Sequence, residues 1–178
     1  MTIIAVRHTS VSVPEGMCYG HTDVETSGTF GIEKEQVAEK LLSENFQVIY
    51  SSPLARCRKL AESVSKGLPV YYDSRLLELN FGRWEGCTWQ DIEKTDEAKL
   101  WFTDWMNIPC PGGESYKQLI TRVQDFLKHI SLINYNILLI THGGVIRALI
   151  SLMSGIDPRE TFELEIDYGS LVKLYTRE

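Results

Sequence analysis

The sequence of 178 residues lacks the signatures of several protein classes. It has no low-complexity tract and no apolar stretch close to the roughly 20 residues that a membrane-spanning helix needs. No basic segment precedes its first short apolar run, so no signal peptide is indicated. No CxxC pair and no zinc-like spacing occurs among its four cysteines, Cys18, Cys57, Cys87 and Cys110. We therefore expect a reduced, cytoplasmic protein with free thiols and no membrane partner.

Positive charge is also scarce. The chain has 18 Lys and Arg against 24 Asp and Glu, which gives a formal charge of −6. This balance disfavours nucleic acid as a partner, although arginines gathered at one place can still bind a small anion. Composition is otherwise that of a globular protein, with 43% hydrophobic and 24% charged residues. The length suits one domain, and the sequence leaves open whether the chain is a monomer or a homodimer.

Patterns typical of strands and helices alternate along the chain. Apolar runs predict strands at residues 3–9, 46–52, 69–72 and 137–142, and an alternating segment predicts an edge strand at 171–175. Helical periodicity predicts helices at residues 32–42, 53–66, 88–107 with a break near 95–96, 115–130 and 144–153. This alternation favours an α/β domain with a mainly parallel sheet covered on both faces.

Two of the predicted strands end in a histidine. Arg7 and His8 follow the first apolar run, and His142 follows the run at residues 137–140. The carboxyl ends of parallel strands meet at one sheet edge, where ligands bind, so we expect the two histidines to face each other. The alternative is that each is a satisfied, buried histidine at a strand end. The irregular segment 10–30 and the segment 88–110 are expected to cover a substrate.

The residues near these histidines suit phosphate chemistry. Arg7, Arg56 and the helix N-terminus after His142 predict an anion site, because each guanidinium can offer a bidentate fork to a phosphate. A neutral imidazole in such a site can attack phosphorus. A carboxyl group is then needed to protonate the leaving oxygen, and Glu78 is the candidate. Glu85 is the alternative, and we expect it to order the local backbone instead.

Five segments in order resemble the histidine phosphatase superfamily, in its phosphoglycerate-mutase-like branch. They are Arg7-His8-Thr9, Ser52-Pro53-Leu54-Ala55-Arg56, residues 77–86, Gly112-Gly113-Glu114-Ser115 and Thr141-His142-Gly143-Gly144. The resemblance implies a three-layer α/β/α sandwich and catalysis that needs no metal and no cofactor. It also implies that His8 becomes phosphorylated, that Glu78 donates a proton, and that the phosphate pocket is completed by Arg7, Arg56 and His142.

Within that branch, Thr9-Ser10-Val11 and residues 14–24 resemble the α-ribazole phosphatases. Those enzymes act on α-ribazole 5′-phosphate in assembly of the cobalamin nucleotide loop, so the implied partner is a small phosphorylated metabolite. The substrate contacts are then expected from Arg7, Thr9, Gly20, His21, Arg56 and Gly143. An ordinary surface position is the alternative for His21. Thr9 replaces the usual glycine of the motif, and the asparagine that follows it in the mutases is absent.

Three other functions remain as alternatives: a broad-specificity phosphatase, a phosphoglycerate mutase, and a non-catalytic protein that binds phosphorylated ligands. The region between the third strand and the helix at 115–130 is short for a cap that protects a long-lived phosphoenzyme, which disfavours the mutase. Trp101 and Trp105, four residues apart, are predicted to share one helix face. Such a stripe is typical of core packing, and as a hypothesis it walls an aromatic nucleoside.

Overall fold

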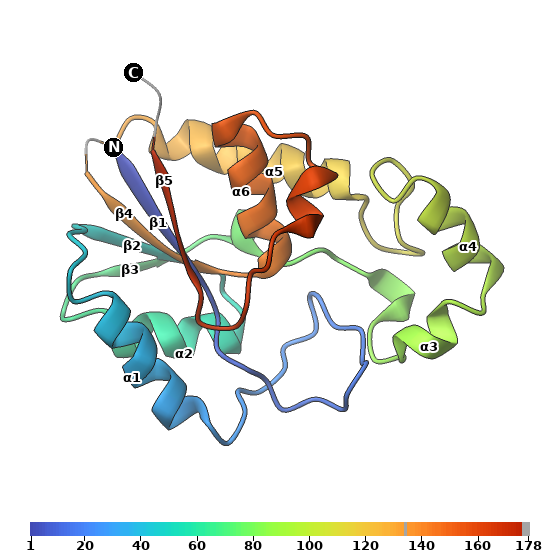
Figure 1. Cartoon of the computed structure of the whole chain (residues 1–178), viewed down its shortest axis with the longest axis horizontal. Helices are drawn as coiled ribbons and strands as arrows, with labels where there is room; N and C mark the ends of the chain where they lie inside the picture. The colour runs from blue at the N-terminus through green and yellow to red at the C-terminus, as the bar shows by residue number, and fades with distance from the viewer. Residues whose placement is uncertain (134, 176–178) are drawn as a thin grey trace.

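The computed structural model describes residues 1–133 and 135–175 (Figure 1). Its centre is a five-stranded sheet with the order β3-β2-β4-β1-β5. The strands are β1 (Thr2–Arg7), β2 (Val48–Ser51), β3 (Val70–Tyr72), β4 (Ile137–Thr141) and β5 (Leu171–Tyr175). The first four are parallel, and β5 pairs antiparallel with β1 at one edge. The predicted mainly parallel sheet is confirmed.

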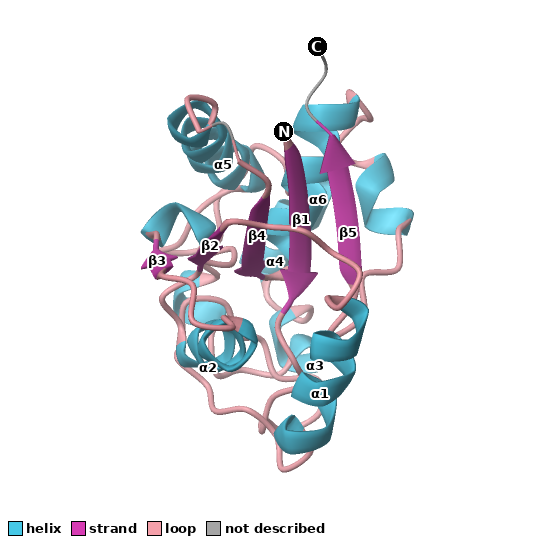
Figure 2. Ribbon diagram, turned by 90° about the vertical axis from the view of Figure 1, so that its left-hand side faces the viewer, coloured by secondary structure: helices cyan, strands magenta, loops and turns pink. Residues whose placement is uncertain are grey.

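Helices cover both faces of the sheet (Figure 2). The covering helices are α1 (Phe30–Lys40) and α2 (Ala55–Val64) on one face, and α5 (Tyr116–Ile130) and α6 (Gly143–Ser154) on the other. Along β1, Ile4 and Val6 pack with the first pair of helices. Ile3 and Ala5 pack with the second pair, because successive side chains of a strand point to opposite faces. The predicted three-layer α/β/α sandwich is confirmed.

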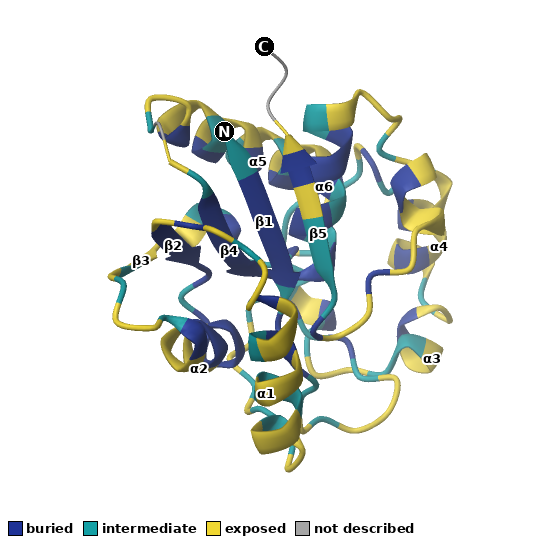
Figure 3. Cartoon of the chain, turned by 60° about the vertical axis from the view of Figure 1, so that its left-hand side comes forward, coloured by how far each residue is buried: buried dark blue, intermediate teal, exposed yellow. Residues whose placement is uncertain are grey.

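Strands β1 and β4 are buried on both faces (Figure 3). This explains why their sequences are continuous apolar runs rather than alternating patterns. Fully burying one Ile, Leu or Val side chain stabilises the fold by roughly 1.5–3 kcal/mol, so these two strands anchor the core. Their parallel register pairs Arg7 with Thr141. The residues that follow the two strands therefore emerge side by side at one edge of the sheet.

The segment between β3 and α5 lies beyond the sheet and carries two short helices (Figure 1). They are α3 (Trp89–Ile92) and α4 (Asp96–Thr103). Two 3-10 helices, Ser74–Leu76 and Gly82–Trp84, lie in the same segment, and a third, Glu160–Glu163, lies between α6 and β5. The predicted break is present, since the Thr95 side chain caps α4. The prediction that Trp101 and Trp105 share one helix was wrong. The helix ends at Thr103, because Asp104 leaves the helical conformation with φ −157°.

The sequence predicts that helix α2 begins at Pro53, but in the structure it begins at Ala55. The cause is a remote cap, since Oδ1 of Asp23 accepts a hydrogen bond from the Ala55 N–H at 2.7 Å. The helix also ends before Lys66, which adopts a left-handed φ of 50°. The start of α2, and with it Arg56, is thus fixed by the 10–30 loop.

Two further properties concern the whole described chain. All four cysteines are free thiols, and among them only Cys87 is exposed. Among the described residues, every helix is too short or too polar to cross a bilayer.

A capping box opens α5, and we expect it to contribute measurably to stability. The Ser115 Oγ accepts from the Gln118 N–H, and the Gln118 Oε1 accepts from the Ser115 N–H at 2.7 Å. Ser115→Ala should lower the free energy of unfolding by about 1 kcal/mol in urea titrations. Ser131→Ala, at the exposed end of the same helix, should change it by less than about 0.5 kcal/mol. Equal losses in the two variants would contradict the capping role.

Candidate active site

Side chains from separate segments meet at the carboxyl edge of β1, β2 and β4. A cavity of about 190 Å³ at this edge is lined by Arg7, His8, Met17, Tyr19, Arg56, Glu78, Phe81, Trp89 and His142. Arg7 and His8 come from the end of β1, Arg56 from the first turn of α2, and His142 from the residue before α6. The structure thus brings together the five catalytic candidates that the sequence indicates.

His8 is buried, and one hydrogen bond fixes the proton on its ring. Its Nδ1 lies 2.7 Å from the carbonyl oxygen of Thr9, which can only accept. Nδ1 therefore carries the proton, and Nε2 keeps its lone pair. Burial lowers the pKa of His8 well below its ordinary value, and Arg56 and Arg7 add to this effect against the opposing Thr9 bond. A neutral ring with a free Nε2 has the form that a nucleophile requires.

His142 is fully buried directly beside His8. Their ring centroids are 5.1 Å apart, with 66° between the ring planes. The His142 Nε2 lies 2.8 Å from the Ser52 hydroxyl. Burial lowers the pKa of His142, and the nearby His8 and the arginines lower it further. When the Ser52 hydroxyl donates to Nε2, the neutral ring carries its proton on Nδ1.

The two arginines are held by main-chain carbonyls. Arg56 donates from Nη1 to the Thr22 oxygen at 2.9 Å and from Nη2 to the Gly20 oxygen at 2.7 Å. Arg7 donates from Nη1 to the Ile166 oxygen at 2.7 Å. The Nε atoms of both arginines are buried without a hydrogen-bond partner in residues 1–133 and 135–175. An unsatisfied buried donor costs roughly 1–3 kcal/mol, which a bound anion would offset.

Glu78 is the carboxylate that reaches the cavity. Its Oε1 accepts from the Leu79 N–H at 2.9 Å, and its Oε2 accepts from the Gly144 N–H at 3.1 Å. A Cβ on residue 144 would lie 2.3 Å from Oε1. Only glycine leaves room for the carboxylate there, so the second glycine after His142 brings the start of α6 against Glu78.

Glu85 holds backbone, as the sequence predicts. Its Oε1 accepts from the N–H groups of His21 and Phe81, and its Oε2 accepts from the N–H and the hydroxyl of Thr22. Partial burial would raise the pKa of Glu85, but these bonds outweigh burial and leave the pKa below its ordinary value. Glu85 therefore stays ionised and ties the 10–30 loop to the turn after Asn80.

The predicted substrate-binding residues other than the two arginines differ in where they lie: Gly20 and Gly143 contribute to the site, whereas Thr9 and His21 do not line its cavity. The Gly20 carbonyl holds Arg56, and Gly143 lines a second cavity of about 200 Å³ together with Arg7 and Glu78. Thr9 and His21 do not line the 190 Å³ cavity. Thr9 is fully buried, and its carbonyl serves His8. The His21 Nε2 lies 4.0 Å from Glu114 Oε1, outside the cavity.

Two tyrosines were not predicted from the sequence. The Tyr168 ring lies 4.0 Å from the Arg7 guanidinium carbon and 5.5 Å from the His8 ring centroid. Its hydroxyl is 2.6 Å from that of Tyr19, whose ring in turn lies 5.3 Å from the Arg56 guanidinium carbon. Tyr168 belongs to a turn without periodicity before β5, so no local pattern marks it. The bridge between these tyrosines joins the 10–30 loop to that turn.

A larger cavity adjoins the first and is mainly aromatic. Its volume is about 620 Å³, and it is lined by Leu79, Phe81, Trp89, Glu93, Trp101, Phe102, Trp105, Tyr116, Arg159 and Phe162. Phe81 and Trp89 line both cavities. Trp101 also packs in the core, edge-on to Trp84 at 5.5 Å. The two tryptophans singled out in the sequence therefore wall a hollow next to the phosphate-sized cavity.

Comparison with known proteins places these features in a family. The family model of the histidine phosphatase superfamily (branch 1) matches residues 3–178. Phosphoserine phosphatase 1 of Hydrogenobacter thermophilus is 26% identical over 183 residues, covering 99% of this chain and 87% of that protein. The adenosylcobalamin/α-ribazole phosphatase of Escherichia coli is 28% identical over 178 residues, covering 95% and 87%.

A solved structure shares the fold. The crystal structure of the α-ribazole phosphatase from Shigella flexneri matches with a TM-score of 0.89 at 24% identity, over 97% of this chain and 89% of that one.

The lowered pKa values of the site histidines predict a pH-dependent stability. In the unfolded chain His8 and His142 take up protons near their ordinary pKa of 6.5, whereas in the fold the pKa of each lies well below that value. Stability is thus fully present above this pH and is lost as the pH falls below it, by up to roughly 1.4 kcal/mol per pH unit for each ring. When the free energy of unfolding is measured by urea titration between about pH 7 and about pH 5, its slope against pH should be shallower for His8→Asn than for the wild type.

The matched control for this slope is His129→Asn, because His129 is exposed on α5. It should keep the wild-type dependence on pH. A His8→Asn slope equal to that of the wild type would show that the His8 ring is protonated alike in the folded and unfolded chains.

Proposed function

The chain belongs to branch 1 of the histidine phosphatase superfamily and is a phosphoric monoester hydrolase, and we propose that it works through a phosphate bound transiently to His8. The geometry that supports this is the His8 ring itself. Its Nδ1 proton is committed to the Thr9 carbonyl at 2.7 Å, and Nε2 belongs to a neutral ring in a cavity with two arginines.

The proposed reaction has two steps. In the first, the His8 Nε2 attacks phosphorus, a P–N bond forms, and the bond from phosphorus to the ester oxygen breaks. Glu78 in its protonated form gives its proton to that oxygen, and the alcohol leaves. In the second, the Glu78 carboxylate takes a proton from water, and the water oxygen attacks phosphorus. The P–N bond breaks, phosphate leaves, and His8 returns to its neutral form.

We propose that three side chains stabilise the negative charge on the transferred phosphoryl group. Arg7 and Arg56 each keep a buried Nε–H without another acceptor in the described part of the chain. His142, beside His8, can add the proton of its Nδ1 when Ser52 donates to its Nε2. These donors are fixed before the substrate binds, so they stabilise the charge that develops on the phosphoryl oxygens without reorganising. No metal takes part in the proposed reaction.

The substrate that we propose is α-ribazole 5′-phosphate, in assembly of the cobalamin nucleotide loop. The observation that carries this proposal is the aromatic cavity of about 620 Å³, which shares Phe81 and Trp89 with the phosphate-sized cavity. A nucleoside phosphate joins an anionic end to a flat aromatic end, and aromatic walls favour stacking of such a ring. The similarity to the Escherichia coli adenosylcobalamin/α-ribazole phosphatase supports the same choice.

Phosphoserine is the second candidate. Glu93 and Arg159 line the aromatic cavity and are groups that could meet the ammonium and carboxylate of an amino acid. The similarity to a phosphoserine phosphatase supports this alternative.

Covalent trapping tests the mechanism. Wild-type protein mixed with a radiolabelled phosphate ester and quenched in alkali should carry acid-labile label, whereas His8→Asn should carry none. His129→Asn is the matched control and should label like the wild type, since its side chain lies on the exposed face of α5. Turnover should persist in the presence of a chelator. Acid-labile label on His8→Asn would rule out His8 as the nucleophile.

A comparison of kcat/KM among α-ribazole 5′-phosphate, phosphoserine and 3-phosphoglycerate tests the substrate. Phe162 is half-exposed and lines the aromatic cavity, so Phe162→Ala removes a wall without opening the core. It should lower kcat/KM for α-ribazole 5′-phosphate about tenfold, which corresponds to roughly 1.4 kcal/mol, and leave phosphoserine turnover unchanged.

Leu100→Ala is the control for this comparison, because Leu100 is exposed on α4 and does not line the cavity. It should match the wild type on every substrate. Equal losses for α-ribazole 5′-phosphate and phosphoserine in Phe162→Ala would contradict the nucleoside assignment. A higher kcat/KM for 3-phosphoglycerate than for the other two substrates would favour the alternative that the protein is a phosphoglycerate mutase.

A further inference from the structure

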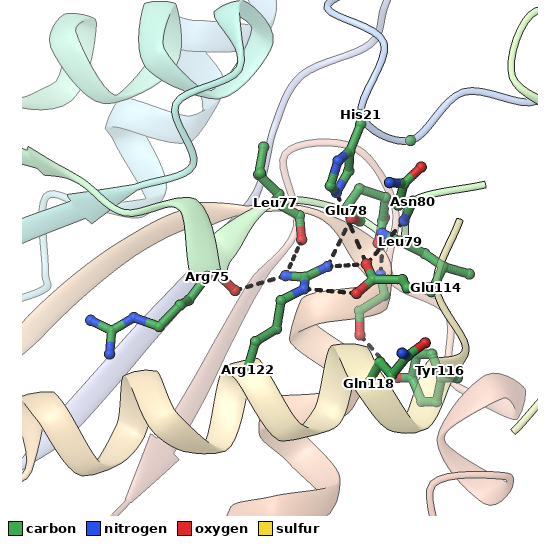
Figure 4. A network of polar contacts seen from close by, with 12 residues as sticks. His21, Arg75, Leu77, Glu78, Leu79, Asn80, Glu114, Tyr116, Gln118 and Arg122 are labelled. Atoms are coloured by element: carbon green, nitrogen blue, oxygen red, sulfur yellow. Dashed lines mark hydrogen bonds and ion pairs between the residues drawn. The ribbon is translucent and has the colours of Figure 1, made fainter. Parts of the chain in front are cut away.

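We propose that Arg122, which lies outside the cavities described above, is a positioning residue for the Glu78 carboxyl. This inference rests on the proposed role of Glu78 as the proton donor. Arg122 is on α5, and its guanidinium points into the bend of the chain that carries Glu78 (Figure 4). Nη1 donates to the carbonyl of Leu77 at 2.6 Å, and Nη2 donates to the carbonyl of Glu78 at 2.8 Å.

The Arg122 guanidinium has no donor left for a ligand. Its Nη1 also donates to the Arg75 carbonyl at 2.8 Å, and its Nε and Nη2 donate to the two carboxylate oxygens of Glu114 at 3.2 and 2.6 Å. These five bonds match the five N–H groups of an arginine. Arg122 therefore acts on the site through backbone and not through substrate, unlike Arg7 and Arg56.

Glu114 binds the main chain on the other side of Glu78. Its Oε1 accepts from the Asn80 N–H at 3.0 Å, and its own N–H donates to the Asn80 carbonyl at 2.9 Å. The Arg122–Glu114 pair thus holds the chain both before and after Leu79. Figure 4 shows the guanidinium between this carboxylate and the carbonyls of the bend.

The bend needs this support because residues 77–81 form neither a strand nor a helix. Main-chain polar groups in a part-buried segment without a ladder must find other partners, and a planar arginine supplies several at fixed angles. The Glu78 side chain is fixed separately by the Gly144 N–H. Backbone and carboxylate are therefore held by α5 and α6 respectively. Proton transfer to a leaving group depends on such placement, and a shift of about 1 Å can cost roughly 100-fold in rate.

Dependence on the leaving group separates this role from a merely structural one. p-Nitrophenyl phosphate releases a stable anion and needs little protonation, whereas an alkyl phosphate needs a proton on its leaving oxygen. Arg122→Lys keeps the charge but cannot reach all the acceptors. It should lower kcat/KM, which reports only the steps up to departure of the leaving group, about 100-fold for the best alkyl phosphate of the substrate panel, and leave kcat/KM for p-nitrophenyl phosphate nearly unchanged. Glu78→Gln should show the same selectivity.

Arg75→Lys is the matched control, because the Arg75 side chain pairs with Asp73 and points away from the bend. It should leave both substrates unaffected. Should Arg122→Lys fail to fold, Glu114→Gln weakens the binding of the same main chain and should show the same selectivity to a smaller degree.

The outcomes separate the two proposals. Equal losses on both esters in Arg122→Lys, with Glu78→Gln selective, would overturn the positioning role alone. A Glu78→Gln variant without selectivity would overturn the acid role of Glu78 and the positioning role with it. Wild-type kinetics in both Arg122→Lys and Glu114→Gln would also overturn the positioning role.

Discussion

The parallel pairing of β1 with β4 is the constraint on which the site depends. Its register sets Arg7 opposite Thr141, so the next residue of each strand emerges at the same edge. His8 and His142 thereby come within 5.1 Å, measured between ring centroids. Other elements also add groups to this edge, among them Arg56 from α2. A slip of either strand by one residue would turn these side chains to opposite faces.

The arginines of this protein are held in two different ways. Arg7 and Arg56 are fixed by neutral carbonyls, so their positive charge is oriented but not cancelled. A bound anion is then the missing counter-charge, and a buried charge without a partner is costly. Arg122 is paired with the carboxylate of Glu114, and all its donors are used. The first two are arranged for a ligand, and the third is arranged for the fold.

Local patterns in the sequence predict the strands, the layers and the residues at the strand ends, because a parallel topology fixes where strand ends lie. They do not predict features set by distant contacts. Helix α2 starts where Asp23 caps it from the 10–30 loop. Trp105 lies beyond the end of α4, because Asp104 leaves the helical conformation, although the spacing of Trp105 from Trp101 is helical. Tyr168 reaches Arg7 through the turn before β5, and no periodicity marks such a turn.

The order of the strands along the chain has a consequence for biosynthesis. β1 is translated first, but its two neighbours in the sheet begin at Ile137 and Leu171. At roughly 5–20 residues per second, an apolar strand waits for many seconds on the ribosome without a pairing partner. Strand pairs so distant in sequence are also slow to form, because a long loop must close first. The sheet edge that carries His8 beside His142 therefore forms only after β4 has been made, because His142 directly follows that strand.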